Sequence, residues 1–142
     1  MFNPSRHQAR QFLFNTWYKY KHQETLSDIE VIALNVILLH PEYQSILDDI
    51  EKYTDKDYPP EMGDTNPFLH MNMHIAITEQ LSIDQPAGIC DRFNRLLKKY
   101  GNEHDTIHQF MECLAEMIWR AQRSQSMPDV AIYFECLDRK EN

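Results

Sequence analysis

Residues 102–124 of the chain read NEHDTIHQFMECLAEMIWRAQRS, and this stretch decides the fold. Its apolar residues recur at spacings of three and four, which is the period of an amphipathic helix. Asn102 is a residue type that caps helix amino termini, and the preceding Gly101 suits the left-handed end of an earlier helix. We therefore predict one long helix from Asn102 to about Ser124.

Similar start and stop signals mark further helices before and after this stretch. Asn-Pro pairs at 3–4 and 66–67 combine a cap with a proline in the first turn, and Ser27 with Glu30 forms a capping box. These signals predict helices over residues 3–22, 27–39, 41–52, 66–83 and 86–100, with a last helix beginning at Pro128. Four long helices with two or three shorter ones predict an all-α fold, a helical bundle, and the length of 142 residues predicts a single helical domain over 1–142.

Residues 53–65 form the one long predicted loop. They contain Pro59, Pro60 and Gly63 among four acidic residues, a composition typical of loops. The segment is interpreted either as a lid or as a plain connection between helices.

The composition excludes several classes of protein. Fourteen Lys and Arg against 22 Asp and Glu give a net charge of −8, so we expect no nucleic-acid partner. The longest apolar stretch, residues 31–39, is interrupted by Asn35 and is too short to span a bilayer, so we expect no membrane insertion. Because GxGxxG, P-loop and GxSxG motifs are all missing from the sequence, we expect no nucleotide cofactor, and the question of enzymatic activity stays open.

Cysteine usage bears on the cellular compartment. The chain has three cysteines, at positions 90, 113 and 136, and none of them forms a CxxC pair. An odd count with no local pairing predicts neither a disulfide framework nor a zinc ribbon. We therefore predict three unpaired core cysteines and a cytoplasmic protein.

The first predicted helix is basic and aromatic, although the protein is acidic. Four basic residues precede the first acidic one, Glu24: Arg6, Arg10, Lys19 and Lys21. Such a helix is a docking element, a mitochondrial presequence, or a helix that packs on its own acidic bundle. Six aromatic residues between positions 2 and 20 favour packing, because presequences are rich in serine rather than in aromatic residues.

Two pairs of histidines stand four residues apart, a spacing that places both rings of a pair on one face of a helix. In the helix predicted over 66–83, His70 and His74 share a face with apolar residues, namely Met73, Ile77 and Leu81. This row is predicted to face the core.

The long helix over 102–124 carries a second row of this kind. His104, His108 and Glu112 share one face, which continues to Ala115 and Trp119. This row is also predicted to face the core.

Together the two rows predict a metal site in the bundle. A histidine pair at i and i+4 can place two imidazoles on one cation, and a carboxylate one turn further on adds a ligand suited to zinc, iron or manganese. The predicted ligands of this divalent metal ion are His70, His74, His104, His108 and Glu112. The Glu-x-x-His spacing of ferritin-like sites and the HExxH spacing of zincins are both missing from the sequence, which excludes these two classes.

Other residues near the rows receive weaker interpretations. Glu79 lies about 180° around the helix from His70 and is excluded from the site. His40 precedes Pro41 and is interpreted first as a helix N-cap and second as a ligand from a third helix. The histidine rows themselves also fit a plain structural role, in which the rings are hydrogen-bonded core groups without metal.

Five strings along the chain carry a resemblance to a known family. They are MFNPSR at 1–6, HPEY at 40–43, NPFLH at 66–70, SIDQP at 82–86 and MECLAEMIWRAQR at 111–123. With them the chain resembles, over nearly its full length, the proteobacterial family of uncharacterised proteins numbered 1841 among the domains of unknown function. The resemblance implies no activity for any residue.

Two hypotheses follow. In the first, the protein is a helical bundle that binds a divalent metal ion through the two histidine rows. In the second, it is a non-catalytic interaction module with a structural histidine cluster and no metal. Its partner is then an acidic protein that contacts the basic first helix or the Arg120 and Arg123 end of the long helix.

Overall fold

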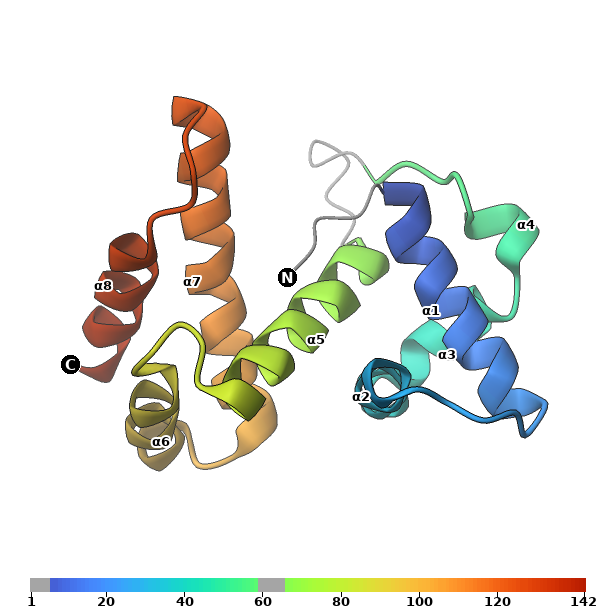
Figure 1. Cartoon of the computed structure of the whole chain (residues 1–142), viewed down its shortest axis with the longest axis horizontal. Helices are drawn as coiled ribbons and strands as arrows, with labels where there is room; N and C mark the ends of the chain where they lie inside the picture. Colours follow the sequence, from blue (N-terminus) through green and yellow to red (C-terminus); the bar gives the residue numbers. More distant parts are fainter. Residues whose placement is uncertain (1–5, 59–65) are drawn as a thin grey trace. The chain divides into compact units, whose positions relative to one another are not determined.

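The computed structural model describes residues 6–58 and 66–142, and helices dominate both ranges, with no strand in either (Figure 1). The helices are α1 (Arg6–Lys21), α2 (Asp28–Leu38), the 3-10 turn η1 (Pro41–Tyr43), α3 (Gln44–Leu47), α4 (Ile50–Tyr53), α5 (Pro67–Ile83), α6 (Ile89–Tyr100), α7 (Glu103–Ser124) and α8 (Val130–Glu141). The predicted all-α class is confirmed. The cap predicted at Asn3-Pro4 and most of the loop predicted over 53–65 lie outside the described residues.

The chain clusters into two compact units, Met1–Ile75 and Ala76–Asn142, and the boundary falls inside α5. We refer to them as unit 1 and unit 2 and describe each by itself.

The helix ends predicted at Ser27, Gly101 and Asn102 are present in the structure. The backbone N–H of Ser27 donates to Glu30 Oε1 at 2.9 Å, and the N–H of Glu30 donates to Ser27 Oγ, which completes the capping box of α2. Asn102 Oδ1 accepts from the N–H of Asp105 at 2.8 Å at the start of α7, and Gly101 ends α6 with a φ of 87°. These contacts satisfy backbone groups that helix ends leave without intrahelical partners.

The helix predicted over 41–52 is wrong in one respect, because the segment is broken into η1, α3 and α4. The break lies at Asp49, whose backbone leaves the helical region at φ −125° and ψ 72°. Its side chain instead accepts from the N–H of Lys52 at 3.3 Å and caps α4. A short acidic side chain that bonds nearby backbone favours such a cap over a helix interior.

Unit 1 is built around an apolar core that four helices share. The core residues come from α1, α2, α3 and the first half of α5, and they are Leu13, Phe14, Trp17, Ala33, Val36, Ile37, Leu47, Phe68, Met71 and Ile75. Removal of this apolar surface from water is the main force that holds the helices together.

The basic side chains of α1 contact groups of unit 1 itself. Arg10 is only 2% exposed, and its guanidinium donates to three backbone carbonyls at and after the end of α4, those of Tyr53, Thr54 and Lys56. Ion pairs join Lys19 to Glu30, Lys21 to Asp48 and Arg6 to Asp57. These contacts support the interpretation of the first helix as a packing element.

Unit 2 contains α6, α7, α8 and the second half of α5. Phe110, Leu114, Tyr133 and Leu137 are among its buried residues, and the Tyr133 hydroxyl donates to Gln80 Oε1 at 2.9 Å. Salt bridges add polar links between α6 and α8, from Arg92 to Asp138 and from Arg95 to Glu141.

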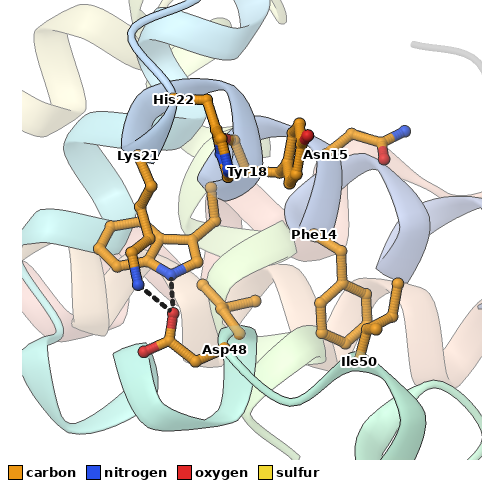
Figure 2. A pocket seen from close by; sticks show the side chains of 9 residues that line it. Phe14, Asn15, Tyr18, Lys21, His22, Asp48 and Ile50 are labelled. Carbon is orange, nitrogen blue, oxygen red and sulfur yellow. Dashed lines mark hydrogen bonds and ion pairs between the residues drawn. The ribbon is translucent and has the colours of Figure 1, made fainter.

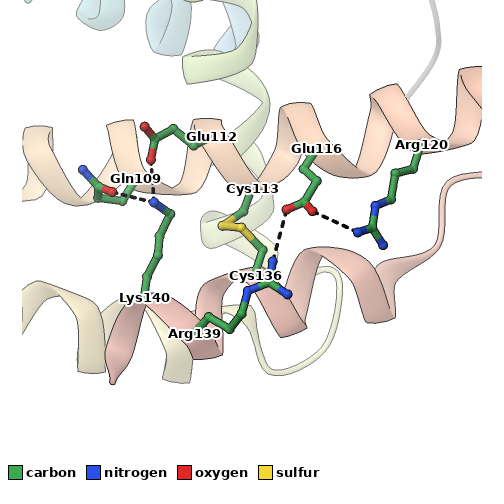
Figure 3. Close-up of a disulfide and its surroundings, with 8 residues drawn as sticks. All are labelled: Gln109, Glu112, Cys113, Glu116, Arg120, Cys136, Arg139 and Lys140. Carbon is green, nitrogen blue, oxygen red and sulfur yellow. Dashed lines mark hydrogen bonds and ion pairs between the residues drawn. A yellow bond between two sulfur atoms is a disulfide. The ribbon is translucent and has the colours of Figure 1, made fainter.

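The prediction of three unpaired cysteines is wrong, because Cys113 of α7 and Cys136 of α8 form a disulfide (Figure 3). The pairing has no local signal, since the two positions lie 23 apart in the sequence and only the packing of α7 on α8 brings them together. Cys90 is the free cysteine among the described residues. The cysteine pattern therefore gives no support to the expected cytoplasmic location.

Polar contacts flank the disulfide on both sides (Figure 3). Lys140 of α8 donates to Gln109 and Glu112 of α7. Glu116 accepts from Arg120 of its own helix and from Arg139 of α8.

The prediction that the α7 histidine row faces the core along its whole length is also wrong. Glu112 and Ala115 are exposed, and Trp119 is 55% exposed. The buried face of α7 instead runs through Phe110, Cys113 and Met117, where α8 packs.

Among the described residues, no helix has both the length and the apolar character needed to cross a membrane.

Candidate metal centre

The first predicted histidine pair lies on the amino-terminal half of α5. Asn66 fixes where this helix begins, because its Oδ1 accepts from the N–H groups of Phe68 and Leu69 at 3.0 and 3.1 Å. His70 and His74 then follow one turn apart. His74 is 1% exposed and His70 is half-buried, beside the core residue Met71.

A third histidine reaches the same place from another segment. His40 lies between α2 and η1, where Pro41 begins a new turn, and it is 3% exposed. Its backbone occupies the N-cap position of η1, but its side chain makes no cap hydrogen bond there. The first interpretation of His40, as a cap, is therefore wrong for the side chain, and the second, as a ligand from another segment, agrees with its position.

The rings of His40, His70 and His74 converge. His40 Nε2 and His70 Nε2 lie 3.1 Å apart, and these two ring centroids are separated by 4.8 Å. The His40 and His74 centroids are 5.4 Å apart, with the rings nearly perpendicular at 88°. One ring nitrogen of each residue lies within 4.8 Å of a ring nitrogen of the other two. We call these three residues the histidine cluster.

A backbone carbonyl of α2 determines which nitrogen of His40 is available to the cluster. His40 Nδ1 lies 2.7 Å from the carbonyl oxygen of Val36. Because a carbonyl oxygen only accepts hydrogen bonds, Nδ1 carries the proton, and in the neutral ring Nε2 presents its lone pair. A metal-ligating histidine typically donates its other N–H to a carbonyl in this way.

Tyr43 of η1 forms one side of the cluster. Its ring stacks on that of His40 at 5.4 Å between centroids, with an interplanar angle of 11°, and it meets the His70 ring edge-on at 5.9 Å. Burial, with a smaller contribution from the charge of Glu42, raises the pKa of the Tyr43 phenol. The hydroxyl is therefore neutral near pH 7.

The second predicted pair lies in unit 2. The rings of His104 and His108 are 4.1 Å apart on α7, so the pair shares a face as its spacing predicts. Glu112 forms an ion pair with Lys140, and its side chain is 63% exposed. The role of His104, His108 and Glu112 as metal ligands stays a prediction.

The histidine cluster fits a metal ion in its donor type and in its spacing. Imidazole nitrogen binds zinc at 2.0–2.1 Å, so two nitrogens on one tetrahedral ion lie about 3.3 Å apart. The Nε2 atoms of His40 and His70 already stand near this separation, at 3.1 Å. The chemistry that the cluster supports is the binding of a cation by uncharged nitrogen ligands.

A separate cavity of about 290 Å³ lies between α1 and the segment from α3 to α4 (Figure 2). Its polar edge is the carboxylate of Asp48, whose Oδ1 accepts from Lys21 Nζ at 2.8 Å and from Trp17 Nε1 at 2.7 Å. These two donors lower the pKa of Asp48. The cavity is lined by Phe14, Asn15, Trp17, Tyr18, Lys21, His22, Leu47, Asp48 and Ile50, so the histidine cluster takes no part in it.

Comparison with known proteins gives one match. No curated protein and no solved structure matches the chain. The model of the family described as a domain of unknown function, DUF1841, matches residues 5–139. The chain therefore belongs to the DUF1841 family.

Proposed function

We propose that the protein binds a divalent metal ion through His40, His70 and His74. The observation that carries this proposal is the convergence of three imidazoles from two segments, with ring nitrogens within 4.8 Å of one another. Histidine is the commonest protein ligand for transition metals, and it binds them as the neutral ring.

Burial adds support, because His40 and His74 are 3% and 1% exposed. The packing around a buried ring holds it in one orientation, so its nitrogen is already in place for a metal ion. The hydrogen bond from His40 Nδ1 to Val36 orients one ligand in the same way that outer-sphere partners orient ligands in known metal sites.

The metal content of the purified full chain tests the proposal. We expect close to one equivalent of metal per chain in the wild type, and loss of that metal in His40→Asn and in His74→Ala. His7→Ala is the matched control, because His7 is exposed on α1 and belongs to no part of the cluster. A chain that takes up no divalent transition metal, or variants that retain it fully, would overturn the proposal.

The same assay tests the ligands predicted on α7. His104, His108 and Glu112 stay proposed metal ligands on the strength of their spacing in the sequence. Loss of metal in His108→Ala with retention in the His7→Ala control supports that extension. Full retention in His104→Ala, His108→Ala and Glu112→Ala restricts the site to the histidine cluster of unit 1.

A second candidate function is that of an interaction module, and one observation in unit 2 favours it. Trp119 is 55% exposed, and the guanidinium of Arg123 lies 5.1 Å from the centre of its ring. Exposed tryptophan and arginine are the residue types that most often carry binding energy at protein interfaces. Titration with an acidic peptide, followed by the fluorescence of Trp119, tests this function. A response lost in Arg123→Ala and independent of metal would support it.

A further inference from the structure

The donor set of the histidine cluster restricts the kind of metal that it holds. Within residues 6–58 and 66–142, the ligand atoms that converge with those of His40, His70 and His74 are imidazole nitrogens. Imidazole nitrogen suits zinc, copper, nickel, cobalt and iron, whereas magnesium, calcium and manganese favour oxygen ligands. The cluster therefore lacks the donors that a hard cation requires.

Resting on the proposed function, we infer that the bound ion is an imidazole-preferring cation at the cobalt-to-zinc end of the first-row series. Zn²⁺ and Co²⁺ are the probes of this class, and Mg²⁺, Ca²⁺ and Mn²⁺ do not bind at the histidine cluster. This narrows the choice of zinc, iron or manganese that the sequence leaves open. A hard ion must give up tightly bound water to enter the site. Neutral imidazoles carry no negative charge that would offset this loss of hydration.

His40 is the ligand that the fold prepares for such an ion. The carbonyl of Val36 that accepts from His40 Nδ1 also accepts from the N–H of Leu39 at 3.2 Å and belongs to the last turn of α2. The carboxyl end of a helix carries partial negative charge, which favours a cation nearby. The same hydrogen bond makes Nε2 a stronger base, and a basic nitrogen donor favours the later first-row ions.

The spacing of the ring nitrogens is compatible with this class of ion. His40 Nε2 and His70 Nε2 lie 3.1 Å apart. A tetrahedral zinc ion places two of its nitrogen ligands about 3.3 Å apart, which is close to this distance. In the present arrangement a proton lies between these two nitrogens, because the bare Nε2 of His40 accepts from His70. The cation takes the place of that proton, and His70 keeps one proton by carrying it on Nδ1 instead.

The test is a competition among metals on the metal-free full chain. The protein is equilibrated with Mn²⁺, Co²⁺ and Zn²⁺ in equal amounts and Mg²⁺ and Ca²⁺ in large excess, and bound metal is measured after gel filtration. We expect Zn²⁺ and Co²⁺ to fill the site, with less than about a hundredth of the sites holding Mn²⁺. The Co²⁺ form should show visible d–d absorption and no thiolate-to-cobalt charge transfer, with an unchanged spectrum in Cys90→Ala.

His40→Asn is the decisive variant, because the asparagine amide can still donate to the Val36 carbonyl while the Nε2 ligand is removed. We expect it to weaken Zn²⁺ binding at least about 100-fold, since the loss of an outer partner alone typically costs 10- to 100-fold. Circular dichroism checks that the variant remains folded, and His7→Ala controls for the loss of an exposed histidine.

The outcomes separate this inference from the proposed function. A chain that binds no metal overturns both. Binding of Mn²⁺, Mg²⁺ or Ca²⁺ as tight as that of Zn²⁺, when lost in His40→Asn, overturns the inference and leaves the proposed function in place. Zn²⁺ binding that His40→Asn does not weaken, or a thiolate band in the Co²⁺ spectrum, overturns the assignment of the cluster as the site.

Discussion

The two units join their helices by different means, although each carries a histidine pair with the same spacing. In unit 1 the apolar core is supplemented by non-covalent polar links: the histidine cluster between α5 and the end of α2, and Arg10 on carbonyls at and after the end of α4. In unit 2 a disulfide joins α7 to α8, with ion pairs around it. Packed helices can thus be held together by hydrogen bonds between side chains or by a covalent bond.

The two histidine pairs lie in different surroundings, although both have the same spacing in the sequence. On α5 the pair lies beside the core, and His40 arrives from a second segment to complete a cluster. On α7 the row that begins with His104 and His108 continues to the exposed Glu112 and Trp119. The same spacing therefore has a different meaning on each helix, and the packing around it decides which.

Among the variants considered, Arg10→Ala in unit 1 is expected to lower the free energy of unfolding most. The substitution leaves three backbone carbonyls without a buried donor and removes the guanidinium that lies 4.5 Å from the Phe68 ring centre. We expect the free energy of unfolding to fall by about 3–5 kcal/mol. Urea unfolding followed by Trp17 fluorescence in a Trp119→Phe background measures it, and a loss below about 1 kcal/mol would contradict the role of Arg10.

Removal of the disulfide is the corresponding change in unit 2. Cys113 and Cys136 lie 23 positions apart in the sequence, and loss of such a cross-link costs about 3 kcal/mol through the entropy of the unfolded chain. Cys136→Ala or a reducing agent should therefore lower the midpoint of the unfolding transition seen by Trp119. Cys90→Ala is the control, since Cys90 is free. Equal midpoints with and without the reductant would contradict a stabilising disulfide.

We expect Zn²⁺ to stabilise unit 1, which contains the histidine cluster. A ligand that binds only the folded state at 100 times its dissociation constant adds about 2.7 kcal/mol. We expect the transition reported by Trp17 to move to higher temperature with Zn²⁺ in the wild type. The shift should vanish in His74→Ala. A shift that persists in His104→Ala indicates that the α7 pair does not bind the ion, and a shift that is lost there indicates that it does. A shift that survives in His74→Ala would contradict the cluster as the site.

The smallest effect concerns the acid dependence of the α2 cap. The backbone N–H of Ser27 is the main cause that lowers the pKa of Glu30, and Lys19 contributes as well. Because the folded pKa is depressed, this stability is present above the unfolded glutamate pKa of about 4.3 and is lost as the pH falls through the folded value.

Glu30→Gln should therefore destabilise the chain by about 1 kcal/mol at pH 7, and the difference should disappear in acid. Unfolding curves at a series of pH values measure this dependence. Asp28→Asn is the comparison, because Asp28 lies in the same first turn of α2 but is not a member of the Ser27–Glu30 capping box. A difference between wild type and Glu30→Gln that stays constant with pH would contradict the assigned role.

Features that depend on residues close together in the sequence could be predicted, and most features that depend on distant residues could not. The caps at Ser27 and Asn102 and the helices that follow them were predicted correctly, and so was the shared face of His70 and His74. All of these depend on hydrogen bonds and spacings within about four residues. The break at Asp49 was missed although it is local, because an Asp inside an apolar period gives a weak signal.

The residues that the sequence did not assign correctly depend on contacts over longer distances. His40 pairs with His70 across 30 residues, and Cys113 pairs with Cys136 across 23. The position of His40, directly before Pro41 and after a helix, is compatible with a ligand from a further segment. The same position also fits a helix cap, so the sequence alone does not distinguish the two roles.

Residues close together in the sequence specify the helices, apart from the broken segment over 41–52, the caps at Ser27 and Asn102 and the face that His70 and His74 share. Contacts between helices in the folded chain decide that His40 joins the α5 pair, that Cys113 and Cys136 bond, and that the row on α7 ends in solvent. The reason is physical. Which face of a helix is buried depends on the apolar surface of the helices packed against it, and no spacing within one helix contains that information.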